Sequence, residues 1–251
     1  MAARREPAWL SAPATGGRSV DLALASALAH PLPVTLWTPD GLGDADAAPL
    51  VWCHDGPEYA QRAALLQWAG AHVEDGSLPP FRLALAQPQR RNQIYSASPR
   101  YLRSFDRAVA DLRDRVPVES PLAVMGASLG GLTSLLVALH DPGVGCVLSQ
   151  SGSFFEAGGE DRAWRWFERV VGAADRVRDG AFADRSDDLL IGLTCGRDEG
   201  NLAANRRMRD ALRRQGFDVA WQTARGGHDW DTWRDTLDPV WPDLLRRAWS
   251  G

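Results

Sequence analysis

The serine best placed for nucleophilic catalysis is Ser128, in the stretch GASLG at residues 126–130. A serine hydroxyl is a weak nucleophile until a neighbouring base removes its proton. In the G-x-S-x-G pattern the serine stands on a sharp strand-to-helix turn, where side chains two residues before and after it have no room. An apolar run at 122–125 precedes the stretch and an expected helix at 132–140 follows it. We therefore predict Ser128 as the nucleophile; the alternative is a glycine-rich turn with an incidental serine.

A general base is expected late in such a chain, on the loop after the last strand. His228, in the string GGHDW at residues 226–230, occupies that place, and we predict it as the base. His54 is the next candidate, because it also follows an apolar run. The remaining histidines fit less well. His30 precedes a proline, His72 lies in a loop and His140 ends a helix.

The acid of a triad must accept a hydrogen bond from the other imidazole nitrogen. The string GRDEG at 196–200 follows an apolar run at 189–195, so Asp198 and Glu199 lie between Ser128 and His228 in the chain. The order serine, acid, histidine matches one of the known triad orders and differs from those of chymotrypsin and subtilisin. The spacing does not decide which of the two carboxylates is the triad acid. Alternatively, both solvate a turn and begin the next helix.

An oxyanion needs two backbone N–H donors beside the nucleophile. One donor is expected from Leu129, the residue after the serine, and the second from the loop after an early strand. The string HDGP at 54–57 lies on such a loop. Asp55 or Gly56 would supply the second donor, because Pro57 has no N–H. An ordinary turn explains the same residues.

Short apolar runs alternate with amphipathic segments along the whole chain, which predicts a three-layer α/β sandwich with a mostly parallel central sheet. No composition shift or repeat marks a linker, so we expect a single domain over 1–251. Residues 22–29 are predicted to belong to a first strand and its connection. The expected strands are 34–37, 50–53, 81–86, 122–125, 144–148, 189–195 and 217–221, and the expected helices are 58–69, 99–112, 132–140, 201–215 and one from 231 onward.

Composition narrows the functional class. The chain has 251 residues, a formal charge of −4 and a pI near 5.7, which argues against nucleic-acid binding. No apolar run approaches the roughly 18 residues that span a bilayer, so no membrane partner is expected. Cys53, Cys146 and Cys195 lie in apolar runs and are predicted to be buried free thiols of a cytoplasmic protein. No metal-ligand spacing is present, and we expect no cofactor.

Five strings resemble the enterochelin (siderophore) esterase branch of the α/β-hydrolases, within the esterase D-like group. They are HDG from residue 54, SLPP at 77–80, GASLGGLTSL at 126–135, VLSQSGSF at 147–154 and GGHDWDTWR at 226–234. The resemblance runs from about residue 50 to 240. The first 30 residues are too few for the additional N-terminal domain of the large enterochelin esterases, so the chain resembles the compact members and the related feruloyl esterases.

The resemblance implies hydrolysis of carboxylic esters through an acyl-serine, with Ser128 as nucleophile and His228 as base. It favours Glu199 over Asp198, because relatives carry the acid three residues after a glycine. Some siderophore esterases resemble a serine–histidine dyad, so a dyad stays open. The resemblance also gives Arg90 and Arg91 as contacts for an anionic substrate, with solvated surface arginines as the alternative.

The segment 155–187 occupies the place of a lid or substrate pocket in related folds. Trp164, with Trp166 and Phe167, would stack on an aromatic acyl group, unless these residues belong to the core. Arg162 and Arg165 would join Arg90 and Arg91 in a basic cluster. We expect a small-molecule ester as the partner, with an iron-siderophore of the catecholate trilactone type favoured.

Three other functions stay open. One is a general carboxyl, feruloyl or acetyl esterase, and another is an acyltransferase, which shares the acyl-serine and differs in the acceptor. The third is a non-enzymatic α/β-hydrolase scaffold that binds a ligand. Neither the natural ester nor the oligomeric state follows from the sequence.

Overall fold

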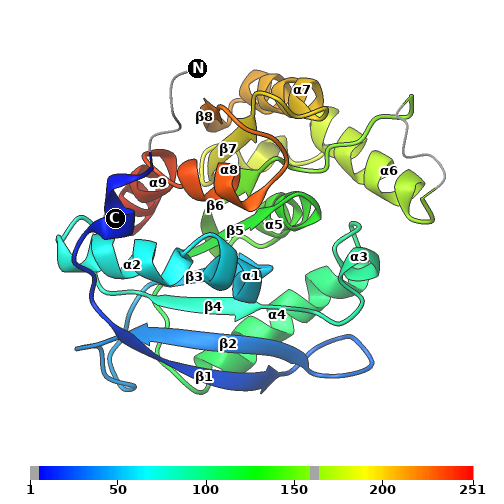
Figure 1. Ribbon diagram of the computed structural model, residues 1–251. Coiled ribbons are helices and arrows are strands. Elements are labelled where there is room, and N and C mark those ends of the chain that lie inside the picture. Colours follow the sequence, from blue (N-terminus) through cyan, green and yellow to red (C-terminus); the bar gives the residue numbers. More distant parts are fainter. Residues whose placement is uncertain (1–5, 159–163, 251) are drawn as a thin grey trace.

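The computed structural model describes residues 6–158 and 164–250, and this part of the chain folds around one eight-stranded sheet. Figure 1 shows the sheet with helices on both sides. The strand order is β1-β2-β4-β3-β5-β6-β7-β8. The strands are β1 (Gly17–Leu24), β2 (Leu32–Pro39), β3 (Leu50–His54), β4 (Arg82–Ala86), β5 (Leu122–Ala127), β6 (Val144–Gln150), β7 (Leu190–Gly196) and β8 (Asp218–Ala224).

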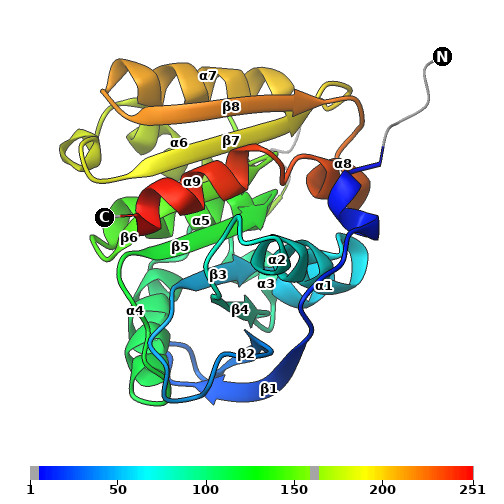
Figure 2. The ribbon, with the colours of Figure 1, turned by 90° about the vertical axis from the view of Figure 1, so that its left-hand side faces the viewer.

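The predicted three-layer α/β sandwich is confirmed, since helices cover both faces of the sheet (Figure 2). The helices are α1 (Gly56–Arg62), α2 (Leu65–Glu74), α3 (Arg91–Ile94), α4 (Pro99–Arg113), α5 (Leu129–His140), α6 (Phe167–Arg178), α7 (Leu202–Arg214), α8 (Trp230–Asp235) and α9 (Val240–Trp249), with short 3₁₀ turns at Ala8–Ser11 and Ala183–Arg185. One apolar cluster packs α4, α5, α6 and α7 on the sheet. A second packs α1, α2, α8 and α9 on the opposite face.

The sheet is mostly parallel, as predicted. β3 pairs in parallel with β4 and β5, and β5, β6, β7 and β8 follow in parallel. The antiparallel pairings lie at one edge, where β2 pairs with β1 and β4, so β2 runs opposite to the other described strands. Because parallel strands end at the same edge, the loops after β3, β5, β6, β7 and β8 meet there. Those loops carry the predicted catalytic residues.

The expected helix over 58–69 is wrong in one respect, because the structure divides it into α1 and α2. Ala64 has a φ of 51°, in the left-handed region that an α-helix excludes. Its neighbour Ala63 ends α1 with a backbone hydrogen bond to Tyr59. The helix expected from 231 is likewise two helices, α8 and α9, separated by the segment around Pro239.

The three cysteines are buried and unpaired, as predicted. Burial raises the pKa of each thiol, in the case of Cys195 to about 12, so these thiols stay protonated and act as small core side chains. Within residues 6–158 and 164–250 no helix has the length and apolarity needed to cross a bilayer.

Candidate active site

Ser128 stands at the turn between β5 and α5 with a φ of 57° and a ψ of −122°. A positive φ is strained for a residue with a side chain and is found at functional turns. Two backbone hydrogen bonds hold the turn to the end of β6: Ser128 N–H donates to Gln150 O at 2.9 Å, and Ser153 N–H donates to Ser128 O at 3.0 Å. The side chain is partly exposed, so the hydroxyl is not sealed within the core.

The glycines around Ser128 are required by close contacts. A Cβ at Gly126 would lie 2.7 Å from the carbonyl group of Gly130, and one at Gly131 would lie 2.8 Å from Ser149 Oγ. A Cβ at Gly130 would lie 3.0 Å from Oδ2 of Asp55. The two glycines that flank the serine at a distance of two residues therefore let strand, helix and the loop after β3 approach one another.

The structure brings Glu199 to His228. Nδ1 of His228 lies 2.8 Å from Oε2 of Glu199. The Glu199 side chain has no exposed surface, while that of His228 is 42% exposed. Asp198, the other candidate, is exposed, and its backbone N–H bonds to Gly226 O instead. Because a carboxylate can only accept, His228 carries its proton on Nδ1 and leaves Nε2 free as the basic nitrogen.

The side chains of Ser151 and Trp233 help to position Glu199 and His228, and sequence reasoning missed both. Oε1 of Glu199 accepts hydrogen bonds from Ser151 Oγ and from Gly196 N–H, each at 2.6 Å. Trp233 Nε1 donates to Ser151 Oγ at 3.0 Å, and the Trp233 ring lies edge-on to the His228 ring with centroids 5.1 Å apart. Both residues lie inside the strings that carry the family resemblance, which was the available signal.

The hydroxyl of Ser128 lies 3.4 Å from that of Ser153. No hydrogen bond joins it to His228 in the described part of the chain. Catalytic hydrogen bonds in unliganded enzymes are commonly long and tighten in the substrate complex. Proton transfer from Ser128 to His228 therefore stays a prediction of the sequence.

The loop after β3 lies against the first turn of α5, as the close approach of Gly130 to Asp55 requires. Asp55 has a φ of 58° and precedes α1, in which Gly56 is the first residue. Leu129 is the first residue of α5. The predicted oxyanion donors thus belong to two adjoining turns, each at the start of a helix, where backbone N–H groups lack helical partners.

The known proteins that this chain resembles are esterases. The Esterase family model matches residues 25–244. The chain belongs to the Esterase family. The iron(III) enterobactin esterase of Escherichia coli K12 is 33% identical over 135 residues, which are 52% of this chain and 30% of that protein. An acetyl esterase of Caldicellulosiruptor saccharolyticus is 42% identical over 43 residues, 17% of this chain and 16% of that protein.

Solved structures share the α/β-hydrolase fold. The enterobactin esterase of Shigella flexneri superposes with a TM-score of 0.79 at 23% identity, covering 98% of this chain and 64% of that one. A ferulic acid esterase superposes with a TM-score of 0.77 at 17% identity, covering 93% of this chain and 99% of that one. The chain thus spans less than two thirds of the enterobactin esterases it matches.

Arg91 has a partner within this Esterase-family fold. Its guanidinium donates to both carboxylate oxygens of Asp55 and lies over the ring of Tyr95, 5.5 Å from the centroid. Burial raises the pKa of Asp55 although the ion pair with Arg91 opposes the shift. Arg91 therefore braces the loop of the predicted oxyanion donors, and its role as a substrate contact stays a prediction.

The structure brings several other predicted substrate contacts together, since Arg90, Arg91, Arg165 and Trp166 line one open cavity of about 510 Å³. Arg90 is exposed and also has a positive φ, 54°. Trp164 is partly buried and packs edge-on against Phe155 and Trp166, with centroids 6.1 and 5.6 Å away. Arg165 lies over the Trp166 ring. Arg162 lies outside the described residues, so the predicted four-arginine cluster is only partly described.

His54, the second candidate base, is buried, and its ring packs within the core. Nδ1 lies 2.7 Å from Ser134 Oγ, and the ring contacts those of Tyr95 and Tyr101. Burial lowers the pKa of His54 to about 3, so the imidazole is neutral near pH 7. No group of three or more potential metal ligands occurs in residues 6–158 and 164–250.

Proposed function

We propose that the protein is a serine esterase that cleaves carboxylic esters through an acyl-Ser128 intermediate. The hydrogen bond between His228 Nδ1 and buried Glu199, 2.8 Å long, is the observation that carries the proposal. It fixes the imidazole tautomer needed for a general base. A scaffold used only for binding has no need of a buried carboxylate on a half-exposed histidine.

In the first half-reaction Ser128 Oγ attacks the ester carbonyl carbon while Nε2 of His228 takes the hydroxyl proton. The negative charge that forms on the carbonyl oxygen is stabilised by the N–H groups of Leu129 and of Asp55 or Gly56. The tetrahedral intermediate collapses by breaking its bond to the alcohol oxygen, and His228 returns the proton to that leaving alcohol. Ser128 is left esterified to the acyl group.

In the second half-reaction water attacks the acyl-Ser128 carbonyl, and His228 takes one of its protons. Collapse of the second intermediate breaks the bond between the acyl carbon and Ser128 Oγ, and His228 returns its proton to Oγ, so the carboxylic acid leaves and the Ser128 hydroxyl is restored. Throughout, the carboxylate of Glu199 stabilises the imidazolium of His228 and keeps its proton on Nδ1. An alcohol in place of water would give acyl transfer.

We favour siderophore-type esters of the catecholate trilactone class as substrates. The Shigella enterobactin esterase was crystallised in the presence of enterobactin, and the family strings of this chain include Ser128, Ser151 and His228. Partly exposed aromatic residues at 164 and 166 suit an aromatic acyl group. The buried free cysteines favour a reducing compartment such as the cytoplasm.

The test is hydrolysis of a short p-nitrophenyl ester together with a screen of a catecholate trilactone, with and without iron, and a feruloyl ester. We expect release of p-nitrophenol and its loss in Ser128→Ala. A fluorophosphonate should add its mass to Ser128 of the wild-type protein. Preference for the feruloyl or short acyl ester would replace the siderophore assignment, and no turnover or labelling with any of these reagents would favour a binding scaffold.

A further inference from the structure

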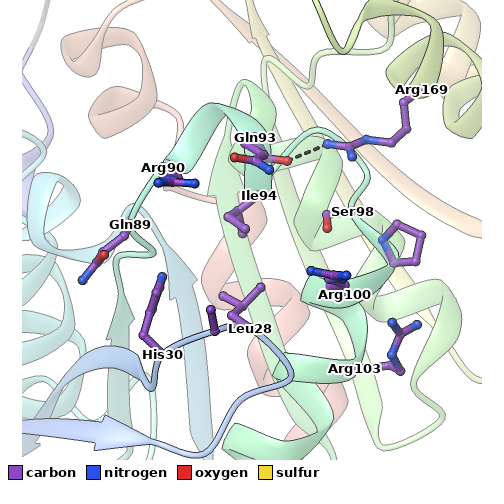
Figure 3. Close-up of a pocket in the computed structure, with 12 residues that line it drawn as sticks. Leu28, His30, Gln89, Arg90, Gln93, Ile94, Ser98, Arg100, Arg103 and Arg169 are labelled. Atoms are coloured by element: carbon purple, nitrogen blue, oxygen red, sulfur yellow. Dashed lines mark hydrogen bonds between the residues drawn. The ribbon is translucent and has the colours of Figure 1, made fainter.

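A second concave site lies away from the predicted catalytic residues. It is a cavity of about 590 Å³ between the β1–β2 connection, the segment after β4 and the start of α4. Neither Ser128, Glu199 nor His228 lines it. Figure 3 shows Arg90 and His30 on one side and Arg100 and Arg103 on the other, with Leu28 and Ile94 between them. We call this cavity the arginine pocket.

The charge of the arginine pocket is one-sided. Its described lining contains four arginines and a histidine but neither aspartate nor glutamate. The chain as a whole has a formal charge of −4, so general basicity does not explain the concentration. A concave surface with charges of one sign raises the local potential and attracts the opposite ion.

Three arginines of the pocket have no ion-pair partner among the residues that the structure describes. Some exposed arginines elsewhere form ion pairs, as Arg18 does with Asp44 and Arg207 with Glu156. In the described part of the chain Arg90, Arg100 and Arg103 form none. Like charges held close together without a counterion repel one another. An anionic ligand would remove this repulsion.

The fourth arginine of the pocket is held in place by hydrogen bonds to the backbone. Arg169, from α6, donates to the backbone carbonyls of Gln93 and Ser96, and the dashed line in Figure 3 marks the contact with Gln93. These bonds use its donors without neutralising its charge. The segment between β4 and α4 is thereby joined to α6, and a cation stays at the rim.

We propose that the arginine pocket binds an organic ligand through a phosphate-type oxyanion. Guanidinium groups present paired N–H donors that match the oxygens of a phosphate. The three arginines without ion pairs lie around a volume larger than one phosphate group, and Leu28, Ile94 and Pro99 supply apolar contacts for the rest of the ligand. This site goes beyond the proposed esterase function: Arg90 is also a predicted substrate contact, but Arg100 and Arg103 are not.

The test is calorimetric titration of the full chain with inorganic pyrophosphate. Both solutions have the same low ionic strength, which is adjusted with sodium chloride. We expect saturable binding to one class of sites in the wild type. The double variant Arg100→Ala/Arg103→Ala should bind about tenfold more weakly or not at all, because two charge-assisted contacts are lost. Alanine keeps the helix of α4 intact.

A matched control removes the same charge from outside the pocket. Arg113→Ala/Arg214→Ala takes two exposed arginines from the last turns of α4 and α7, and its affinity for pyrophosphate should equal that of the wild type. Absence of binding to the wild type, or equal weakening in both double variants, would overturn the proposal. Hydrolysis of a short p-nitrophenyl ester by Arg100→Ala/Arg103→Ala, which should be unchanged, separates this result from the esterase test.

Discussion

The hydroxyl of Ser151 donates a hydrogen bond to Oε1 of Glu199 across 2.6 Å, while Oε2 of the same carboxylate faces His228. Trp233 donates to that hydroxyl from α8 and packs against the His228 ring. One serine after β6 thus connects the acid after β7 with the histidine loop after β8. Since Gly196 N–H also donates to Oε1, three donors hold the carboxylate, which has little freedom to rotate away from the base.

Removing that hydroxyl should impair the chemical step. In Ser151→Ala we expect kcat to fall about tenfold or more with little change in KM, because a hydrogen bond to a charged group contributes roughly 1.5–3 kcal/mol. Steady-state hydrolysis of a p-nitrophenyl ester measures both constants. The matched control is Ser149→Ala, since Ser149 Oγ is buried and has no hydrogen-bond partner among the residues that the structure describes. Equal kcat in the two variants would contradict the positioning role of Ser151.

The two adjacent carboxylates should respond differently to neutralisation. Glu199→Gln is expected to lower kcat by about 10⁴-fold, as loss of the triad carboxylate does in serine proteases. Asp198→Asn, at an exposed position, should stay within about twofold of the wild type, because surface substitutions have small effects. The same ester assay compares the pair. A larger loss in Asp198→Asn than in Glu199→Gln would exclude the proposed triad.

The stability of the turn at Ser128 should depend on its glycines. Gly126→Ala places a Cβ 2.7 Å from the Gly130 carbonyl group, and such overpacking costs about 1–3 kcal/mol. Gly172→Ala is the control: Gly172 lies within α6, its Cβ would meet nothing within 4 Å, and the change should stabilise the helix by up to about 1 kcal/mol. Thermal unfolding of both variants should give midpoints below and above that of the wild type. A raised midpoint for Gly126→Ala would refute the close packing.

Burial of neutral His54 should make stability depend on pH. Burial lowers its folded pKa from 6.5 to about 3, so the unfolded chain takes up a proton that the folded chain excludes. The stabilisation is complete above pH 6.5 and is lost toward pH 3, by up to about 1.4 kcal/mol per pH unit. Denaturant unfolding of the wild type and His54→Asn should therefore show a free-energy gap that narrows with acidification. A constant gap would mean that the imidazole is accessible to protons when folded.

Local patterns were sufficient to predict the elements and most of the catalytic candidates. The G-x-S-x-G stretch between an apolar strand and a helix identifies Ser128, and the late histidine loop identifies His228, because these signals depend on neighbours within a few residues. The alternation of strands and helices likewise predicted the α/β sandwich. The split between α1 and α2 escaped prediction, since Ala64 carries no local sign of a left-handed backbone.

Contacts between distant loops needed the tertiary structure. Glu199 and Asp198 are adjacent and chemically alike, so spacing could not choose between them. The family resemblance favoured Glu199, and the tertiary structure shows Glu199 in contact with His228. Arg91 pairs with Asp55, which lies 36 residues before it, and Ser151 and Trp233 converge on the acid from 48 residues before it and from the other side of the histidine. The arginine pocket is likewise assembled from four segments: the β1–β2 connection, the segment after β4, the start of α4, and α6. A sequence specifies the side chains and their local conformations. The packing of the loops at the sheet edge determines which side chains form hydrogen bonds or interact electrostatically.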